Sequence, residues 1–240
     1  MRIAVLSDIH ANLPALDAVL AALGEVDAVW HLGDIVGYGP HPDEVVERLR
    51  EVGAVGVRGN HDEAALGTVD VAYFNPAARW AVEWTGQRIA PATRAWLEAL
   101  PERLEIDDVT LVHGSPRDPT WEYVTTTPVA RANLGAFTTP YCLHGHTHVP
   151  VAWRDDDGHV ELVRPSDGSE LALDARRVLL NPGSVGQPRD GDPRASALLV
   201  DTDARSVTWR RVDYAIRAVQ ADIRAAGLPT WLADRLATGD

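Results

Sequence analysis

Short apolar runs that end in polar residues recur along the chain, and this pattern is the first guide to the fold. Six runs rich in β-branched or other apolar residues are each followed at once by Asp, His, Asn or Ser side chains. Continuous apolar runs bounded by Gly and polar residues predict strands that are buried on both faces. The predicted strands cover residues 3–6, 29–32, 55–57, 109–112, 141–143 and 178–180.

Helix signals separate the first three of these strands. Asn12 is placed to cap a helix that has Pro14 in its first turn and ends at Gly24. A second helix is predicted over residues 42–51, with Gly53 beyond its end. The resulting β-α-β-α-β order predicts a parallel sheet with helices packed against it, and therefore an α/β fold.

The rest of the chain changes in character. Residues 63–100 are Trp-rich and largely helical, with an interruption at Pro91, and we expect this segment to cover or flank the strand ends like a cap. Beyond residue 150 the pattern predicts short strands and hairpin turns, and therefore a second sheet packed on the first. These strands are expected at 149–154, 159–164, 170–173, 177–180, 197–201 and 206–212, before closing helices at 214–226 and 229–237. Nothing in the sequence divides the chain, so we expect a single domain over residues 1–240.

Composition fits a soluble globular protein. Hydrophobic residues make up 45% of the chain and charged residues 24%. No apolar run approaches the roughly 20 residues that cross a bilayer, and the run at residues 3–6 is too short for a secretory signal. We therefore expect a cytoplasmic protein without membrane contacts.

Charge narrows the classes of partner. The formal net charge is −13, and all 22 basic residues are Arg. This Arg-only composition fits either a GC-rich genome or adaptation to salt or heat. A strongly acidic chain is a poor candidate for a groove that binds long nucleic acid, because cations supply most of that affinity. Small phosphorylated substrates remain compatible with this acidic charge.

Metal chemistry is the strongest functional signal. Cys142 is the only cysteine, so a metal site must use His, Asp, Glu or Asn. Ligands of parallel sheets collect at the carboxyl ends of the strands, and we expect five of the six runs to deliver metal-binding side chains to that edge. Residues two apart in an extended segment point to the same side, so each Asp-x-His or His-x-His pair is expected to face one ion or two neighbouring ions. The candidate ligands are Asp8, His10, Asp34, Asn60, His113, His146 and His148.

The order of these motifs resembles that of a known family. Asp8-x-His10, Gly33-Asp34, Gly59-Asn60-His61-Asp62, His113 and Gly145-His146-Thr147-His148 are similar to the motif set of the calcineurin-like metallophosphoesterase superfamily. The phrases at 7–12, 33–40 and 181–186 resemble its small prokaryotic phosphodiesterases, some of which look like diadenosine-tetraphosphate hydrolases. The resemblance runs from residue 1 to about residue 200.

The resemblance implies a four-layer α/β/β/α sandwich with two metals along one edge. Carried over by position, one metal is held by Asp8, His10, Asp34 and His148, and the other by Asp34, Asn60, His113 and His146. Asp34 then bridges two divalent ions. Mn²⁺ is the favoured ion, and Fe, Ni, Co or Zn also suit these ligands.

The chemistry expected of such a site is phosphate-ester hydrolysis. Two cations about 3.5–4 Å apart generate hydroxide at neutral pH and stabilise the in-line displacement. His61 is expected to protonate the leaving alkoxide, and Asp62 to orient its imidazole. Arg58 either holds a phosphate oxygen or is a structural residue.

Other residues carry two open interpretations. Arg117, Trp121 and Tyr123 follow His113 and either bind a nucleotide or pack the 63–100 segment onto the sheet. Arg189 has the same two open interpretations, substrate binding or packing. The segment 181–184 is either a tight turn or a support for the active site.

The predicted function is therefore a two-metal hydrolase of small phosphodiesters or nucleotides, such as dinucleoside polyphosphates or cyclic nucleotides. Its alternatives are a phosphomonoesterase or protein serine/threonine phosphatase. A nuclease is disfavoured by the acidic charge. A non-catalytic scaffold, like the retromer subunit that resembles this fold, is disfavoured because all seven ligand positions and His61 are filled. A homo-oligomer is left open.

Overall fold

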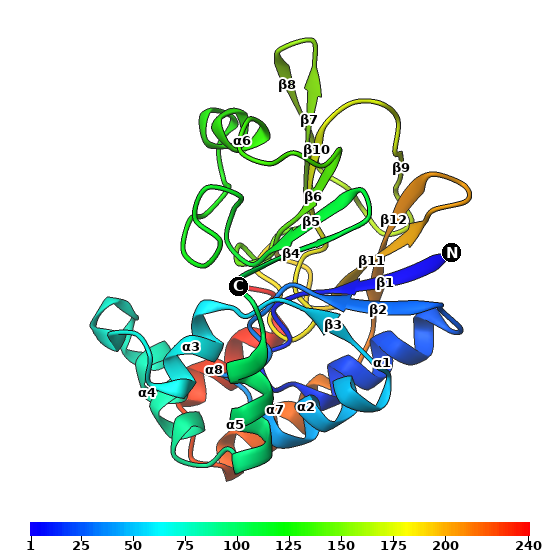
Figure 1. Cartoon of the computed structure of the whole chain (residues 1–240). Helices are drawn as coiled ribbons and strands as arrows, with labels where there is room; N and C mark the ends of the chain where they lie inside the picture. The colour runs from blue at the N-terminus through cyan, green and yellow to red at the C-terminus, as the bar shows by residue number, and fades with distance from the viewer.

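Two six-stranded β-sheets lie face to face in the computed structural model, which describes residues 1–240 (Figure 1). The first sheet consists, in spatial order, of β3 (Val55–Gly56), β2 (Ala28–His31), β1 (Arg2–Leu6), β11 (Ala195–Asp201), β12 (Ser206–Val212) and β9 (Glu170–Ala172). The second consists of β4 (Arg103–Ile106), β5 (Val109–Val112), β6 (Tyr141–Leu143), β10 (Val178–Asn181), β7 (Val151–Asp156) and β8 (His159–Val163). Both sheets are mixed.

The topology confirms the β-α-β-α-β start and corrects the grouping of the later strands. β1 and β2 run parallel, as do β2 and β3, whereas β11 pairs antiparallel with β1. The strands beyond residue 150 do not form a sheet of their own. β9, β11 and β12 complete the first sheet, while β7, β8 and β10 join β5 and β6 in the second.

Helices bound the two sheets on the outside. They are α1 (Leu13–Leu23), α2 (Pro42–Glu51), α3 (Asn60–Leu66), α4 (Pro76–Gly86), α5 (Pro91–Ala99), α6 (Thr127–Leu134), α7 (Ile216–Ala225) and α8 (Thr230–Asp234), with 3₁₀ turns η1 (Val71–Tyr73) and η2 (Arg235–Ala237). The Asn12 side chain caps α1 by accepting a hydrogen bond from the Ala15 amide at 3.2 Å. The predicted bounds of α2 are confirmed.

The hydrophobic core separates into the layers expected of a sandwich. Val5 and Trp30 of the first sheet meet Leu143 and Leu180 of the second in one buried cluster between the sheets. A second cluster lies between the outer face of the first sheet and α1 and α2. A third lies between the second sheet and α6. The four-layer α/β/β/α arrangement is therefore confirmed, with the larger helical layer on the first sheet (Figure 1).

The helical stretch predicted over residues 63–100 forms most of α3 and all of η1, α4 and α5. The interruption expected at Pro91 is confirmed, because α4 ends at Gly86 and the next helix begins at Pro91. Pro91 lies in the first turn of α5, where its missing N–H would have no intrahelical partner. Ile89 and Leu97 of this stretch join the cluster formed by α1 and α2, so the segment is anchored on the helical layer of the first sheet.

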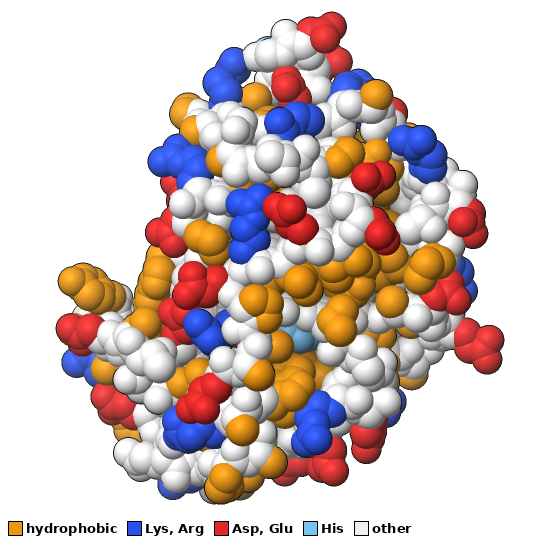
Figure 2. Space-filling model, viewed as in Figure 1, with side chains coloured by type: hydrophobic (Ala, Val, Ile, Leu, Met, Phe, Trp, Pro, Cys, Tyr) orange, Lys and Arg blue, Asp and Glu red, His pale blue; other side chains and the backbone are white.

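Side chains of both charge signs are interspersed over the face shown in Figure 2, and hydrophobic side chains gather across its middle. None of the helices combines the length and apolar character that a membrane span requires.

Candidate metal centre

Seven candidate ligands lie at the carboxyl ends of five strands, but those strands belong to both sheets. Asp8 and His10 follow β1, Asp34 follows β2, and Asn60 begins α3 after β3. His113 follows β5, and His146 and His148 follow β6, which are strands of the second sheet. The expectation of a single sheet edge is corrected: the site forms where the carboxyl ends of two sheets meet.

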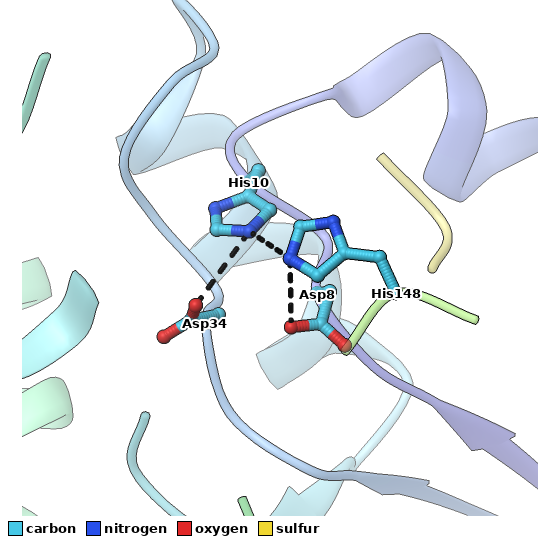
Figure 3. A group of neighbouring side chains, drawn as sticks. All are labelled: Asp8, His10, Asp34 and His148. Carbon is cyan, nitrogen blue, oxygen red and sulfur yellow. Dashed lines mark hydrogen bonds and ion pairs between the residues drawn. The ribbon is translucent and has the colours of Figure 1, made fainter. Parts of the chain in front are cut away.

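One group brings together Asp8, His10, Asp34 and His148 (Figure 3). The Nε2 atoms of His10 and His148 are 3.2 Å apart. His148 Nε2 lies 3.2 Å from Asp8 Oδ1, and His10 Nε2 lies 3.6 Å from Asp34 Oδ2. All four side chains are buried, so their donor atoms face one another in a space closed to bulk solvent.

The second group shares Asp34 with the first. His113 Nε2 lies 3.5 Å from Asp34 Oδ1, 3.0 Å from Asn60 Oδ1 and 3.0 Å from His146 Nδ1. Because Oδ2 of Asp34 faces His10 and Oδ1 faces His113, one carboxylate presents an oxygen to each group. His146 and His148, two residues apart, serve different groups.

Backbone carbonyls fix which nitrogen each imidazole presents. Nδ1 of His10, His113 and His148 lies 3.2, 2.8 and 2.6 Å from the carbonyl oxygens of residues 36, 32 and 187, respectively. Each ring therefore donates from Nδ1 and leaves the lone pair of Nε2 toward the other ligands. His146 is reversed: Nε2 donates to the Trp121 carbonyl at 3.2 Å, and Nδ1 faces His113.

The electrostatics of the site favour a cation. Burial, followed by the charges of Asp8 and Asp62, raises the pKa of Asp34 well above its usual value. Burial also lowers the pKa of His10, His113 and His146, and lowers that of His148 to about 4. The neutral imidazoles provide lone pairs, and a cation beside Asp34 would offset the burial and the repulsion that raise its pKa. This donor set fits divalent metal ions that accept nitrogen and oxygen.

Donor spacing leads to the same conclusion. Two ligands held about 2.1 Å from one ion at angles between octahedral and tetrahedral lie roughly 3.0–3.4 Å apart. The donor separations given above run from 3.0 to 3.6 Å. Four of the six separations lie within this range, and the two that involve Asp34 exceed it by 0.1–0.2 Å, so within each group the donors are spaced nearly as ligands of one ion are.

Backbone strain is concentrated at the same residues. Asp8, His10, Asp34, His146 and His148 all have left-handed φ, between 50° and 65°. Such conformations cost of order 1–3 kcal/mol each and gather at functional sites. They also replace the extended segments assumed for the Asp-x-His and His-x-His pairs.

The 181–186 loop supports the ligand loops. Asn181 Nδ2 donates to the Gly145 carbonyl at 2.7 Å, and Ser184 Oγ donates to the Asp8 carbonyl at 2.8 Å. The backbone amide of Gly186 also donates to the Asp8 carbonyl, at 3.0 Å. Of the two interpretations of this segment, the contacts favour a support for the site.

His61, the expected proton donor, lies against the first group. Its ring centroid is 4.8 Å from that of His10 and 4.4 Å from that of Tyr38. Phe74, from the 63–100 stretch, closes the other side at 5.0 Å. Nδ1 of His61 is buried without a hydrogen-bond partner. Burial, followed by the charge of Arg189, lowers the pKa of His61.

Asp62 does not orient His61 as expected. Its Oδ1 accepts hydrogen bonds from the amides of Ile35 and Val36 at 2.9 and 3.0 Å, and its Oδ2 accepts one from the Gly59 amide at 2.9 Å. Burial raises the pKa of Asp62 to about 7. Since both oxygens are taken by backbone amides, the residue ties the loop after Asp34 to the start of α3.

Arg58 is directed away from the expected phosphate contact. Its Nε and Nη2 pair with Glu63 and Glu102 at 3.3 and 3.5 Å, and its Nη1 donates to the Leu100 carbonyl at 3.0 Å. Because its donors are engaged by these groups, the contacts favour the structural interpretation of Arg58, in which it joins α3 to the end of α5.

The aromatic residues expected to bind substrate contact the second group through His146. The ring of Tyr123 stacks on His146 with centroids 3.8 Å apart, and Tyr123 is half-exposed. Trp121 accepts the His146 hydrogen bond through its carbonyl, and its ring packs on Phe74 at 5.7 Å. Arg117 pairs with Glu122 at 3.4 Å and is half-exposed.

Tyr38 is a site residue that the sequence reasoning missed. Its ring packs against both His10 and His61, and its hydroxyl lies 3.4 Å from Nη2 of Arg189. The sequence signal that could have identified it is its position four residues after Asp34, because a loop that follows a ligand residue begins near the ligand group. Arg189, left open from sequence, is the nearby cation.

Comparison with known proteins gives the class. A model of the calcineurin-like phosphoesterase superfamily domain matches residues 1–205. The chain belongs to this superfamily, and it is accordingly a metal-dependent phosphoesterase, a hydrolase.

Individual relatives extend over the whole chain. A crystal structure of a metallophosphoesterase from Sphaerobacter thermophilus is 49% identical, with a TM-score of 0.92 over 100% of this chain and 99% of the other. An uncharacterised protein of Methanocaldococcus jannaschii is 36% identical over 99% of this chain and 98% of its own. Phosphodiesterase YfcE of Escherichia coli K12 is 30% identical over 86% of this chain and 91% of its own.

Proposed function

We propose that the chain hydrolyses small phosphodiesters or nucleotides with two divalent cations, one in each ligand group. The observation that carries the proposal is the division of the Asp34 carboxylate between the groups, with Oδ2 toward His10 and Oδ1 toward His113. The name of the YfcE relative as a phosphodiesterase supports the diester preference.

The proposed ligands are those expected from the sequence. Asp8, His10, Asp34 and His148 would hold one ion, and Asp34, Asn60, His113 and His146 would hold the other. Mn²⁺ is the ion we propose, because carboxylate, amide and imidazole donors suit it. Bound cations would lower the pKa of a water molecule and offset charge on the phosphoryl oxygens.

The chain's own residues contribute orientation and proton transfer. Carbonyl acceptors hold the imidazoles with their lone pairs inward, so little reorganisation accompanies the reaction. His61 lies beside the first group and is proposed to protonate the leaving alkoxide. Because burial lowers its pKa in the free site, this role requires the bound phosphate to favour the protonated imidazole. Tyr123 and Trp121 are proposed to line the path of the leaving group on the His146 side, with Arg117 at its margin.

Residues 63–100 are proposed to act as a cap over this path within a single 1–240 domain. Phe74 supports this role because its ring contacts both His61 and Trp121, at 5.0 and 5.7 Å. The cap would keep bulk water from the side of the site where the leaving group departs.

A substrate panel tests the function. Protein loaded with Mn²⁺ is assayed with bis-aryl phosphodiesters, dinucleoside polyphosphates, cyclic nucleotides and aryl monophosphates. We expect higher kcat/KM for one of the first three classes than for monophosphates, and about two ions per chain by elemental analysis. A wide preference for monophosphates contradicts the diesterase proposal, and fewer than one ion per chain contradicts the two-metal proposal.

A further inference from the structure

Two arginines from distant parts of the chain meet on one neutral side chain. Arg189 Nη2 donates to Gln187 Oε1 at 2.8 Å, and Arg235 Nη1 donates to the same oxygen at 3.0 Å. Arg189 also contacts the Tyr38 hydroxyl, and Arg235 contacts a backbone oxygen of Asp240 and the Trp231 ring. Asp240 is the acidic residue whose charge acts on Arg235, and no acidic side chain forms an ion pair with either guanidinium, in a chain with net charge −13. Two like charges therefore converge on a neutral side chain.

This arginine pair, Arg189 and Arg235, lies beside the proposed metal centre. The guanidinium carbon of Arg189 is 5.7 Å from the centroid of the Tyr38 ring, and that ring also packs on His10, a residue of the first ligand group, at 4.6 Å. Gln187, on which the pair meets, accepts the Nδ1 hydrogen bond of His148 through its own carbonyl, at 2.6 Å. Gln187 therefore links the arginine pair to His148 of the first ligand group.

The pair retains unused donor capacity. Nε of Arg189 is buried and has no hydrogen-bond partner. Burial lowers the pKa of Arg235 to about 10, and the charge of Arg189 is the second cause. An anion placed between the two arginines would relieve their repulsion and supply acceptors to both forks.

The second arginine comes from outside the family domain. Arg235 lies in η2, beyond residues 1–205, which the superfamily model matches. α7 and α8 hold it in place, because Val219 and Leu232 pack with Ala81 of α4 in one buried cluster. In Figure 1 these C-terminal helices, in orange and red, lie under the first sheet, and their buried side chains pack with those of α4. The C-terminal extension, which consists of α7, α8 and η2, therefore adds a cation to a site whose proposed metal ligands all lie within residues 1–205.

We propose that Arg189 and Arg235 form a second anion-binding subsite, which holds a phosphate of the substrate other than the one attacked at the metal centre. The inference rests on the proposed function and narrows its substrate class to esters or anhydrides with at least two linked phosphates. Among the classes considered above, dinucleoside polyphosphates fit, whereas cyclic nucleotides and simple diesters have only one phosphate.

Isothermal titration calorimetry measures anion binding at this subsite without requiring turnover of a substrate. Protein loaded with Mn²⁺ and freed of excess metal is titrated with tripolyphosphate and, separately, with orthophosphate, and its metal content is measured again afterwards. We expect Arg235→Gln and Arg189→Gln to weaken tripolyphosphate binding by about tenfold or more, the effect of losing a charge-assisted hydrogen bond, and to weaken orthophosphate binding much less. Arg235→Lys should recover part of the loss because it retains the charge.

Arg224→Gln is the matched control. Arg224 lies on α7 of the same extension but pairs with Asp234 at 2.7 Å and is exposed, so its loss should change neither affinity. Equal weakening of both anions by Arg235→Gln, or no weakening of tripolyphosphate binding, overturns the subsite. The two proposals fail separately: wild-type protein without phosphoesterase activity but with Arg235-dependent tripolyphosphate binding contradicts only the proposed function.

Discussion

The Nε2 atoms of His10 and His148 face each other at 3.2 Å although neither has a proton to donate. Both rings donate from Nδ1, to the carbonyls of Val36 and Gln187. Burial lowers the pKa of each imidazole, so both are neutral. Two opposed lone pairs repel each other in an interior without water. A cation bound by both nitrogens would replace that repulsion with two metal–ligand contacts.

Asp34→Asn is expected to reduce metal binding in both ligand groups together. One carboxylate serves both, and an amide provides only one oxygen and no negative charge. Elemental analysis of the purified variant should show loss of both ions. His148→Gln and His146→Gln are the comparison variants, because each removes a ligand of one group only. An Asp34→Asn protein that retains one ion at full occupancy contradicts the shared role.

His61→Ala is expected to retain both ions and to lose about 10²–10⁴-fold in kcat, the usual contribution of a general acid. The loss should be largest for leaving groups of high pKa, because these need the proton most. A series of aryl phosphodiesters with graded leaving groups measures this as a steeper dependence of log kcat on leaving-group pKa. An equal loss for all leaving groups would assign His61 to binding or structure.

Gly37→Ala offers a second test of His61 without changing it. A Cβ at Gly37 would lie 2.6 Å from Nδ1 of His61, so the imidazole must move. Gly37 also has φ of 83°, where any L residue is strained by about 1–2 kcal/mol. Gly67→Ala is the control, since Gly67 has φ of 78° in the left-handed region with open space around it. Both variants should lose similar stability from φ strain, but only Gly37→Ala should lose kcat; equal kcat values would show that the position of His61 is unimportant.

The parts of this site that the sequence predicts are those encoded locally. An apolar run followed by Asp8, or by Asp34, determines both a strand and the end at which the polar group emerges. The bounds of α2 follow from Pro42 and the residues before Gly53 in the same way. The direction in which a side chain points is not determined by the local sequence. Arg58 is two residues from Asn60, yet it reaches the carbonyl of Leu100 because α3 begins between them.

Long-range contacts account for the other differences. β4 was missed because Arg103–Ile106 is a short, partly exposed edge strand that gains its order from pairing with β5. The assignment of β5 and β6 to the second sheet depends on which strands pair, and buried strands of either sheet have the same apolar pattern. Arg235 reaches Gln187 from the far end of the chain, and no local motif marks such a contact.

His31 is expected to make folding stability depend on pH in a defined window. The residue is fully buried near Trp96, and burial lowers its pKa from 6.5 to about 4. Between these values the unfolded chain binds more protons at this site than the folded chain, so stability falls as the pH drops from 6.5 toward 4. At pH 5 the contribution of His31 to this loss is about 2 kcal/mol. His31→Leu, which cannot titrate, should therefore lose about 2 kcal/mol less than wild type between pH 7.5 and pH 5 in denaturant titrations. Parallel losses in the two proteins would show that His31 is protonated equally in the folded and unfolded chains.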